Sequence, residues 1–369
     1  QILRQAWPVL VGSWAGIAFG VLDTVMVGHS SPIDLQAMGL GVSIYITVFI
    51  GLMGVIHALI PIIAQQFGAR RLTEVGRWWG QGVWLALLLT LIGTLALAFP
   101  NIWLRWSGDL SPEVHDRVTW YLRSLILALP AALVFRTIYC LGTATSRPKA
   151  VMLINLFSVA FKALFNWVLI FGKFGLPAMG AVGSGLATTV VSWLMLAAGL
   201  WLLRTDRYYK PFTLRLGLPN WAAQKELLRL GLPMGGSYLI EICAFSFMAL
   251  LVAREGVFAS GAHQIMANLA AVCFMVPMAV GVAAASVSAQ AIGAGQYHRA
   301  RQVGMLNLGI VLAGAPLTIT LLVLLRLAQG FSAAGEQASA NSMTLEHAPE
   351  NRRGFFTSFT LNGTQMGQI

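Results

Sequence analysis

Charged residues are scarce in this chain. They make up 10% of its 369 residues, whereas 57% of the residues are hydrophobic and the mean hydropathy is +0.74. So little charge cannot cover the hydrated surface of a water-soluble protein of this length. The composition therefore excludes an ordinary soluble globular protein and predicts an all-α membrane protein, in which the lipid bilayer itself is a partner.

Cysteine is nearly absent, with only Cys140, Cys243 and Cys273. These three have neither paired spacing nor metal-ligand spacing, so a disulfide framework and a cysteine metal site are excluded. The six histidines likewise form no metal-binding pattern, and neither a nucleophile motif nor a phosphate loop is visible. We therefore expect no enzymatic activity and no cofactor.

Acidic residues are fewer than basic ones, 13 against 24, which gives a net charge of +11. Most lysines and arginines fall in the amino-terminal segment and in the loops near 67–81, 142–150, 204–230 and 293–303. The positive-inside rule then predicts a cytoplasmic amino terminus. Because this asymmetry accounts for much of the charge, a nucleic-acid partner is not expected.

Long apolar stretches are what the chain has in abundance. A helix needs about 20 mainly apolar residues to cross the bilayer, and candidates lie near 8–28, 37–66, 82–104, 118–141, 151–172, 178–203, 231–252, 260–292 and 304–325. A weaker tenth begins near Phe355. Two of the nine are longer than a crossing requires and contain Pro61 or Pro277, which predicts tilt, a kink, or a span that runs into a loop-side helix.

The sequence also repeats itself at a fixed offset. Residues separated by 225 positions are identical at several places: Arg4 and Arg229, Pro8 and Pro233, Ala64 and Ala289, Gln65 and Gln290, Gly68 and Gly293, Ala69 and Ala294. Six spans precede the second copy, so both copies begin on the same side of the membrane. This pattern predicts two lobes related by a pseudo-twofold axis along the membrane normal, as in many transporters.

Two carboxylates fall inside apolar spans. A charge near the bilayer centre costs at least ~2.5–3.5 kcal/mol and is retained mostly where it faces a bundle interior or a wet cavity. Asp23 lies in the first span and Glu241 in the seventh. Such a carboxylate can exchange H⁺ or Na⁺ for a cationic solute, which is an antiport mechanism. The alternatives are a hydrated, inert Asp23 near the outer mouth and an internally paired, structural Glu241.

Several motifs occur together in the order of one known family. They are Asp23 to Gly28, Pro61 to Ala69, Gly142 to Pro148, Phe171 to Thr188, Gly231-Leu232-Pro233, Glu241, and Gly261-Ala262-His263-Gln264 followed by Asn268. Over roughly residues 1–320 the chain resembles the multidrug and toxic compound extrusion (MATE) transporters of the NorM-like branch. The resemblance implies a monomeric exporter of cationic, amphipathic drugs in the bacterial inner membrane, driven by Na⁺ or H⁺.

The resemblance also assigns roles to residues. It makes Asp23, Asn166 and Glu241 the cation- or proton-coupling residues, with Lys162, Gln264 and Asn268 as modulators. Lys162 departs from the pattern, because the family usually has an asparagine or carboxylate one turn before Asn166. Its ammonium could pair with Asp23 and compete with the coupling cation, or it could extend toward the membrane interface. Arg136 in the fourth span poses the same alternative.

The carboxyl-terminal residues depart further. From Arg326 to Gly354 the chain resembles a span and loop of major facilitator proteins of the metabolite:proton symporter branch, and a divergent MATE terminus is the alternative. We therefore expect a composite chain with a six-helix lobe (1–203), a cytoplasmic linker (204–230), a partial lobe of about three helices (231–325) and a facilitator-like fragment (326–369). On this reading transport is impaired in the truncated chain.

Two other functions remain open at this point. One is a flippase for lipid-linked oligosaccharides, in which Arg123, Arg136 and Lys162 would hold a pyrophosphate in one cleft with Asp23 and Glu241 outside it. The other is a non-functional chimeric product.

Overall fold

The computed structural model describes residues 2–104, 111–173, 175, 177–253, 257–314, 316 and 320, without the side chains of 249–270. The chain divides into two compact units. Gln1–Ile242 and Met278–Asn307 form the first, and Cys243–Pro277 and Leu308–Ile369 form the second. The segment after Arg326, with its expected loose packing, lies outside the described residues.

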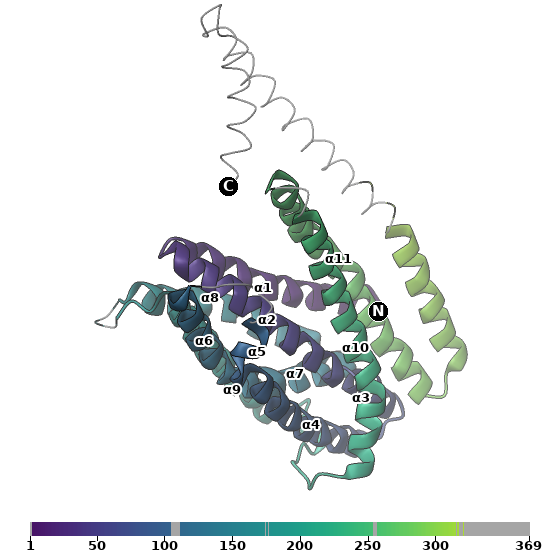
Figure 1. Cartoon of the computed structure of the whole chain (residues 1–369). Helices are drawn as coiled ribbons and strands as arrows, with labels where there is room; N and C mark the ends of the chain where they lie inside the picture. The colour runs from purple at the N-terminus through teal and green to yellow at the C-terminus, as the bar shows by residue number, and fades with distance from the viewer. Residues whose placement is uncertain are drawn as a thin grey trace, which may run out of the picture. The chain divides into compact units, whose positions relative to one another are not determined.

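Helices account for nearly all of the described chain, and no strand occurs in it, which confirms the all-α class (Figure 1). In order they are α1 (Ile2–Gly28), α2 (Pro32–Ile56), α3 (Leu59–Gly68), α4 (Leu72–Ala98), α5 (Pro100–Leu104), α6 (Pro112–Ile126), α7 (Leu129–Ala144), α8 (Pro148–Phe171), α9 (Gly180–Thr205), the 3₁₀ turn η1 (Lys210–Phe212), α10 (Trp221–Ala253) and α11 (Val257–Gly293). A further helical stretch covers 297–314.

Seven helices of the described chain are long and apolar enough to cross a membrane, or eight if a bent pair counts as one span. The six spans expected before the linker correspond to α1, the 37-residue stretch of α2 and α3, α4, the bent pair of α6 and α7, α8, and α9. Many large apolar side chains on α4 and α8 are exposed, among them Leu91, Leu95, Phe157 and Leu164. Exposed apolar faces on helices of this length are what contact with lipid requires.

Prolines explain where two of the spans break. Pro61 has no N–H to donate to the carbonyl of His57, and that carbonyl instead accepts from the amide of Ile60 at 3.0 Å, where α2 gives way to α3. Pro130 stands at the start of α7 in the same way, where α6 and α7 meet at 45°. The sequence predicted the first break but not the second. At Pro277 the expected distortion takes no such form, because α11 continues through it as one helix.

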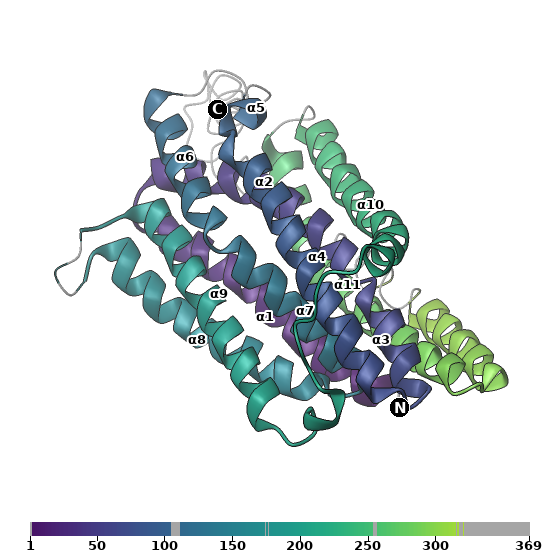
Figure 2. The same ribbon diagram turned by 90° about the horizontal axis from the view of Figure 1, so that it is seen from below.

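The core of the bundle is built around α7, which packs against α4, α9, α3 and α2. Most of its residues are buried. α8 and α9 run side by side and α1 packs along α8, so these three helices form one wall of the lobe (Figure 2). The Asp23 region therefore lies where α1 meets α8.

The linker between the repeats is docked onto the first lobe. Gln81 on α4 donates to the carbonyl of Leu218 and accepts from the amide of Asn220, both at 2.9 Å. Gly76, also on α4, lies so close to the linker that a Cβ on it would be 1.9 Å from the carbonyl oxygen of Phe212. Arg147 pairs with Asp206 at 2.9 Å. These contacts fix the path of the chain from α9 toward α10.

The two copies of the repeat meet through their own matching residues. A Cβ on Gly68 of α3 would lie 2.0 Å from the carbonyl oxygen of Gln290, and one on Gly293 of α11 would lie 1.9 Å from that of Gln65. Each glycine thus packs on the backbone of the residue that corresponds to its own neighbour three positions earlier. Such a reciprocal contact is what a local twofold axis between α3 and α11 produces.

Candidate cation-coupling site

The site lies between three helices, two of which each supply two residues from a single face. Lys162 and Asn166 are four positions apart on α8, so they lie one above the other. Ser184 and Thr188 have the same spacing on α9. Asp23 comes from α1, near its carboxyl-terminal end. Because α8 packs on both α1 and α9, its polar face meets theirs inside the lobe.

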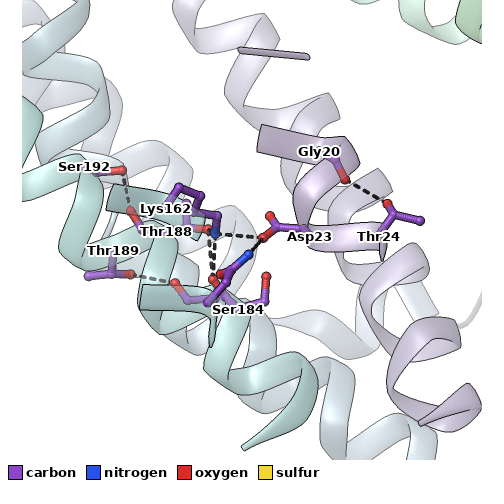
Figure 3. A network of polar contacts seen from close by, with 10 residues as sticks. Gly20, Asp23, Thr24, Lys162, Ser184, Thr188, Thr189 and Ser192 are labelled. Atoms are coloured by element: carbon purple, nitrogen blue, oxygen red, sulfur yellow. Dashed lines mark hydrogen bonds and ion pairs between the residues drawn. The ribbon is translucent and has the colours of Figure 1, made fainter. Parts of the chain in front are cut away.

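Asp23 holds the centre of the network (Figure 3). Its Oδ1 atom lies 2.9 Å from Nζ of Lys162 and accepts a hydrogen bond from Nδ2 of Asn166 at 2.7 Å. Lys162 is 0% exposed, Asn166 is 0% exposed and Asp23 is 8% exposed. An ammonium and a carboxylate are therefore buried as a contact pair.

Lys162 makes two further contacts. Nζ donates to the carbonyl oxygen of Ser184 at 3.0 Å and to Oγ1 of Thr188 at 2.5 Å. The Thr188 hydroxyl itself donates to the Ser184 carbonyl at 3.0 Å, so it serves Lys162 as an acceptor. Three acceptors around Nζ match the three donors of an ammonium, whereas a neutral amine has only two. The geometry thus fits a charged lysine paired with an ionised aspartate.

Among the residues that the structure describes, two buried oxygens beside this pair find no hydrogen-bond partner: Oδ1 of Asn166 and Oγ of Ser184. Buried polar atoms are nearly always hydrogen-bonded, and exceptions cluster at functional sites. Each belongs to a residue that contacts the pair through another atom, Nδ2 of Asn166 and the carbonyl of Ser184. The site therefore offers more acceptors than its side chains use.

This geometry decides several alternatives left open by the sequence. Asp23 is buried inside the lobe and is not a hydrated residue at a mouth, and Lys162 reaches Asp23 and not the membrane interface. The flippase alternative placed Asp23 outside the cleft of the basic residues, whereas Lys162 contacts Asp23 directly. Arg123 stacks on Trp120, with its guanidinium 5.1 Å from the ring centre, and Arg136 lies 4.9 Å from that of Tyr139.

Glu241 is not part of the Asp23 network. It lies on α10, where it is exposed, and within the described residues it forms no ion pair. Gln264 and Asn268, which were predicted with Lys162 as modulators, lie on α11 among the residues whose side chains are not described. No cluster of three or more metal-ligating His, Cys, Asp or Glu side chains occurs in the described part of the chain.

One buried charge pair was missed by the sequence reading. Asp34 on α2 is 4% exposed and accepts from Arg117 on α6 at 2.5 Å, while the other terminal nitrogen of Arg117 contacts Glu113 at 2.9 Å. Both acidic residues lie in the first turn of their helices, where a negative charge is favourable. Asp34 and its partner Arg117 are 83 residues apart, so the pairing leaves no trace in the local sequence.

Comparison with known proteins identifies the family. The family model described as MatE matches residues 8–168 and 233–345. The chain belongs to the MatE family. Its two matched segments begin at Pro8 and Pro233, the repeat pair separated by 225 residues. Membership makes it a membrane transport protein and not an enzyme.

Named relatives agree. The chain is 38% identical over 320 residues to the "Probable multidrug resistance protein NorM" of Aromatoleum aromaticum, an alignment that covers 84% of this chain and 68% of that protein. It is 30% identical over 328 residues to the "Multidrug resistance protein MdtK" of Yersinia pseudotuberculosis, covering 88% and 72%.

Solved structures show the same fold. The MATE transporter NorM-NG, solved in a complex that includes a monobody, matches with a TM-score of 0.72 and 30% identity over 86% of this chain and 69% of that one. A eukaryotic MATE transporter, AtDTX14, gives a TM-score of 0.75 at 18% identity, covering 97% and 77%. The family match continues to residue 345, past the junction expected near 320–326. The facilitator-like origin of 326–369 stays a prediction.

Proposed function

We propose that this MatE protein is a cation-coupled antiporter that exports cationic, amphipathic compounds across the bacterial inner membrane. The observation that carries the proposal is the buried Asp23 network between α1, α8 and α9, set in a chain whose relatives are multidrug resistance proteins. A carboxylate in a membrane-embedded core can alternate between a proton, a metal cation and a cationic solute. The flippase alternative is not favoured.

Coupling is assigned to three side chains. Asp23 and Glu241 carry the charge that binds the coupling ion, Na⁺ or H⁺, and Asn166 orients Asp23 through its 2.7 Å hydrogen bond. Lys162 modulates the first of these sites, and Gln264 and Asn268 modulate the second. The hydrogen bond from Asn166 restricts the rotation of the Asp23 carboxylate.

Topology and assembly complete the proposal. The amino terminus is cytoplasmic, because the loops on that side hold most of the basic residues. Residues 1–203 are the first lobe, 204–230 the cytoplasmic linker, 231–325 a partial second lobe and 326–369 a segment of facilitator-like origin. The protein acts as a monomer with small-molecule substrates and has no nucleic-acid partner.

The test is ethidium efflux from membrane vesicles under an imposed Na⁺ or pH gradient. Asp23→Asn and Glu241→Gln keep the side-chain shape and remove the charge, so each is expected to abolish gradient-dependent efflux while membrane insertion persists. Asp116→Asn is the matched control, because that carboxylate is 81% exposed. Efflux at the wild-type rate in both variants would refute the assignment. Absence of efflux in the wild-type chain itself would instead favour the non-functional product.

A further inference from the structure

The ammonium of Lys162 lies where the surrounding atoms would suit a free cation. Its three partners are a carboxylate oxygen of Asp23, the carbonyl of Ser184 and the hydroxyl of Thr188. Carboxylate, carbonyl and hydroxyl oxygens are the ligands that hard cations prefer in proteins. The nitrogen thus fills a position with the ligand set of an alkali cation.

A second observation points the same way. Oδ1 of Asn166 and Oγ of Ser184 are buried and form no hydrogen bond within the described part of the chain, although other atoms of the same two residues contact Asp23 and Lys162. They are further oxygens on residues that already contact the pair, in addition to the three that surround Nζ of Lys162. A lysine can use only three acceptors.

We propose that Lys162 is a tethered cation, which occupies the cation position of the first lobe and excludes Na⁺ from Asp23. A Na⁺ ion bound about 4 Å from the ammonium would be repelled by it, and in a partly screened interior this repulsion weakens Na⁺ binding by about a thousandfold. The side chain is fully buried and held at three points, so it does not vacate the position in this conformation.

The inference deepens the proposed function, since it says which ion Asp23 does not bind. It is tested without transport. The purified full chain with Glu241→Gln, which removes the other intramembrane carboxylate, serves as the background protein. Its thermal midpoint is measured in NaCl and in choline chloride at equal ionic strength, alone and with Lys162→Asn, Lys162→Arg, Asp23→Asn, or Lys162→Asn combined with Asp23→Asn.

The background protein and the Lys162→Arg variant are expected to show equal midpoints in the two salts, because both retain the tethered charge. Lys162→Asn opens the oxygen set and is expected to gain a saturable Na⁺-dependent rise of roughly several degrees, which follows from binding to the folded state alone. The added Asp23→Asn substitution is expected to remove that rise. The thermal midpoints do not depend on transport, so failure of this inference can be told apart from failure of the proposed function.

Two outcomes would overturn the inference. One is a Na⁺-dependent midpoint in the background protein that Asp23→Asn abolishes, since Na⁺ would then reach Asp23 past Lys162. The other is a folded Lys162→Asn protein with no response to Na⁺. Should Lys162→Asn fail to fold in either salt, Lys162→Gln takes its place, and binding of ²²Na⁺ to the background protein is decisive on its own.

Discussion

Removing one member of the Lys162–Asp23 pair should destabilise the protein far more than removing both. Lys162 has 1% of its side chain exposed and Asp23 has 11%, so neither charge can be hydrated when its partner is lost. Breaking a buried pair from one side typically costs about 3–5 kcal/mol, whereas replacing the whole pair by neutral groups of similar volume is often close to neutral. We therefore expect Lys162→Met and Asp23→Asn each to lose about 3–5 kcal/mol.

The double variant should recover most of this loss. When Lys162→Met and Asp23→Asn are combined, no uncompensated charge remains. The amide oxygen introduced at position 23 can still accept the hydrogen bond that Asn166 donates to Asp23 at 2.7 Å in the wild type. At ~2–4 °C per kcal/mol, each single variant should unfold roughly 10 °C below the wild type, and the double variant well above either single. The interaction energy of such a cycle isolates the pair from the packing of each side chain.

The assay is thermal unfolding of the detergent-solubilised protein, followed by intrinsic tryptophan fluorescence. Lys149→Met is the matched control for loss of a lysine. Lys149 lies near the start of α8, 5.4 Å from the ring centre of Trp7, and has no carboxylate partner in the described chain. Additive effects of the two substitutions, or single variants as stable as the wild type, would show that the two charges do not depend on each other.

Two further predictions concern contacts between helices, one between the two copies of the repeat and one within the first lobe. Gly68→Ala and Gly293→Ala each place a Cβ about 2 Å from a backbone oxygen that cannot rotate away, so each is expected to destabilise the protein by about 1–3 kcal/mol or more. The control is Gly281→Ala, whose Cβ would meet nothing within 4 Å and which should be neutral or slightly stabilising in the same unfolding assay. Asp34→Asn removes the buried charge that pairs with Arg117, and it is expected to lower the free energy of unfolding by about 1.5–3 kcal/mol. Glu113→Gln removes the exposed partner of Arg117 and should cost under ~1 kcal/mol, so equal losses in the two variants would contradict the prediction.

The spans could be predicted because the signal for each lies within its own segment. Apolar length alone located α1, α8 and α9, and Pro61 marked the end of α2. It misplaced α4, which begins at Leu72 inside the expected loop near 67–81 and ends at Ala98. Pro130 is a helix-breaking residue like Pro61, but the apolar stretch around it has the ordinary length of one span. Nothing in the sequence therefore predicted a break there. Whether a proline ends a helix depends on the packing around it, as the continuous α11 at Pro277 illustrates.

The site could be predicted only as far as its spacing. Lys162 and Asn166 are four residues apart, which places them on one face of α8 without any reference to tertiary structure. Which way the long lysine side chain runs depends on α1 and α9, and the sequence left both directions open. Thr188 and Ser184 were not singled out at all, because small hydroxyl residues are common in membrane helices and their value as acceptors appears only when Lys162 reaches them.

The two intramembrane carboxylates have unequal chemical environments, and this inequality bears on coupling. Asp23 already has a positive charge 2.9 Å away, whereas Glu241 is exposed and forms no ion pair within the described residues. A site that holds its own counter-ion releases little free energy on taking up Na⁺, while an unpaired carboxylate gains the full interaction. If efflux depends on Na⁺ concentration, that dependence should therefore trace to Glu241, and it should persist in variants that alter Lys162 only by exchanging it for arginine.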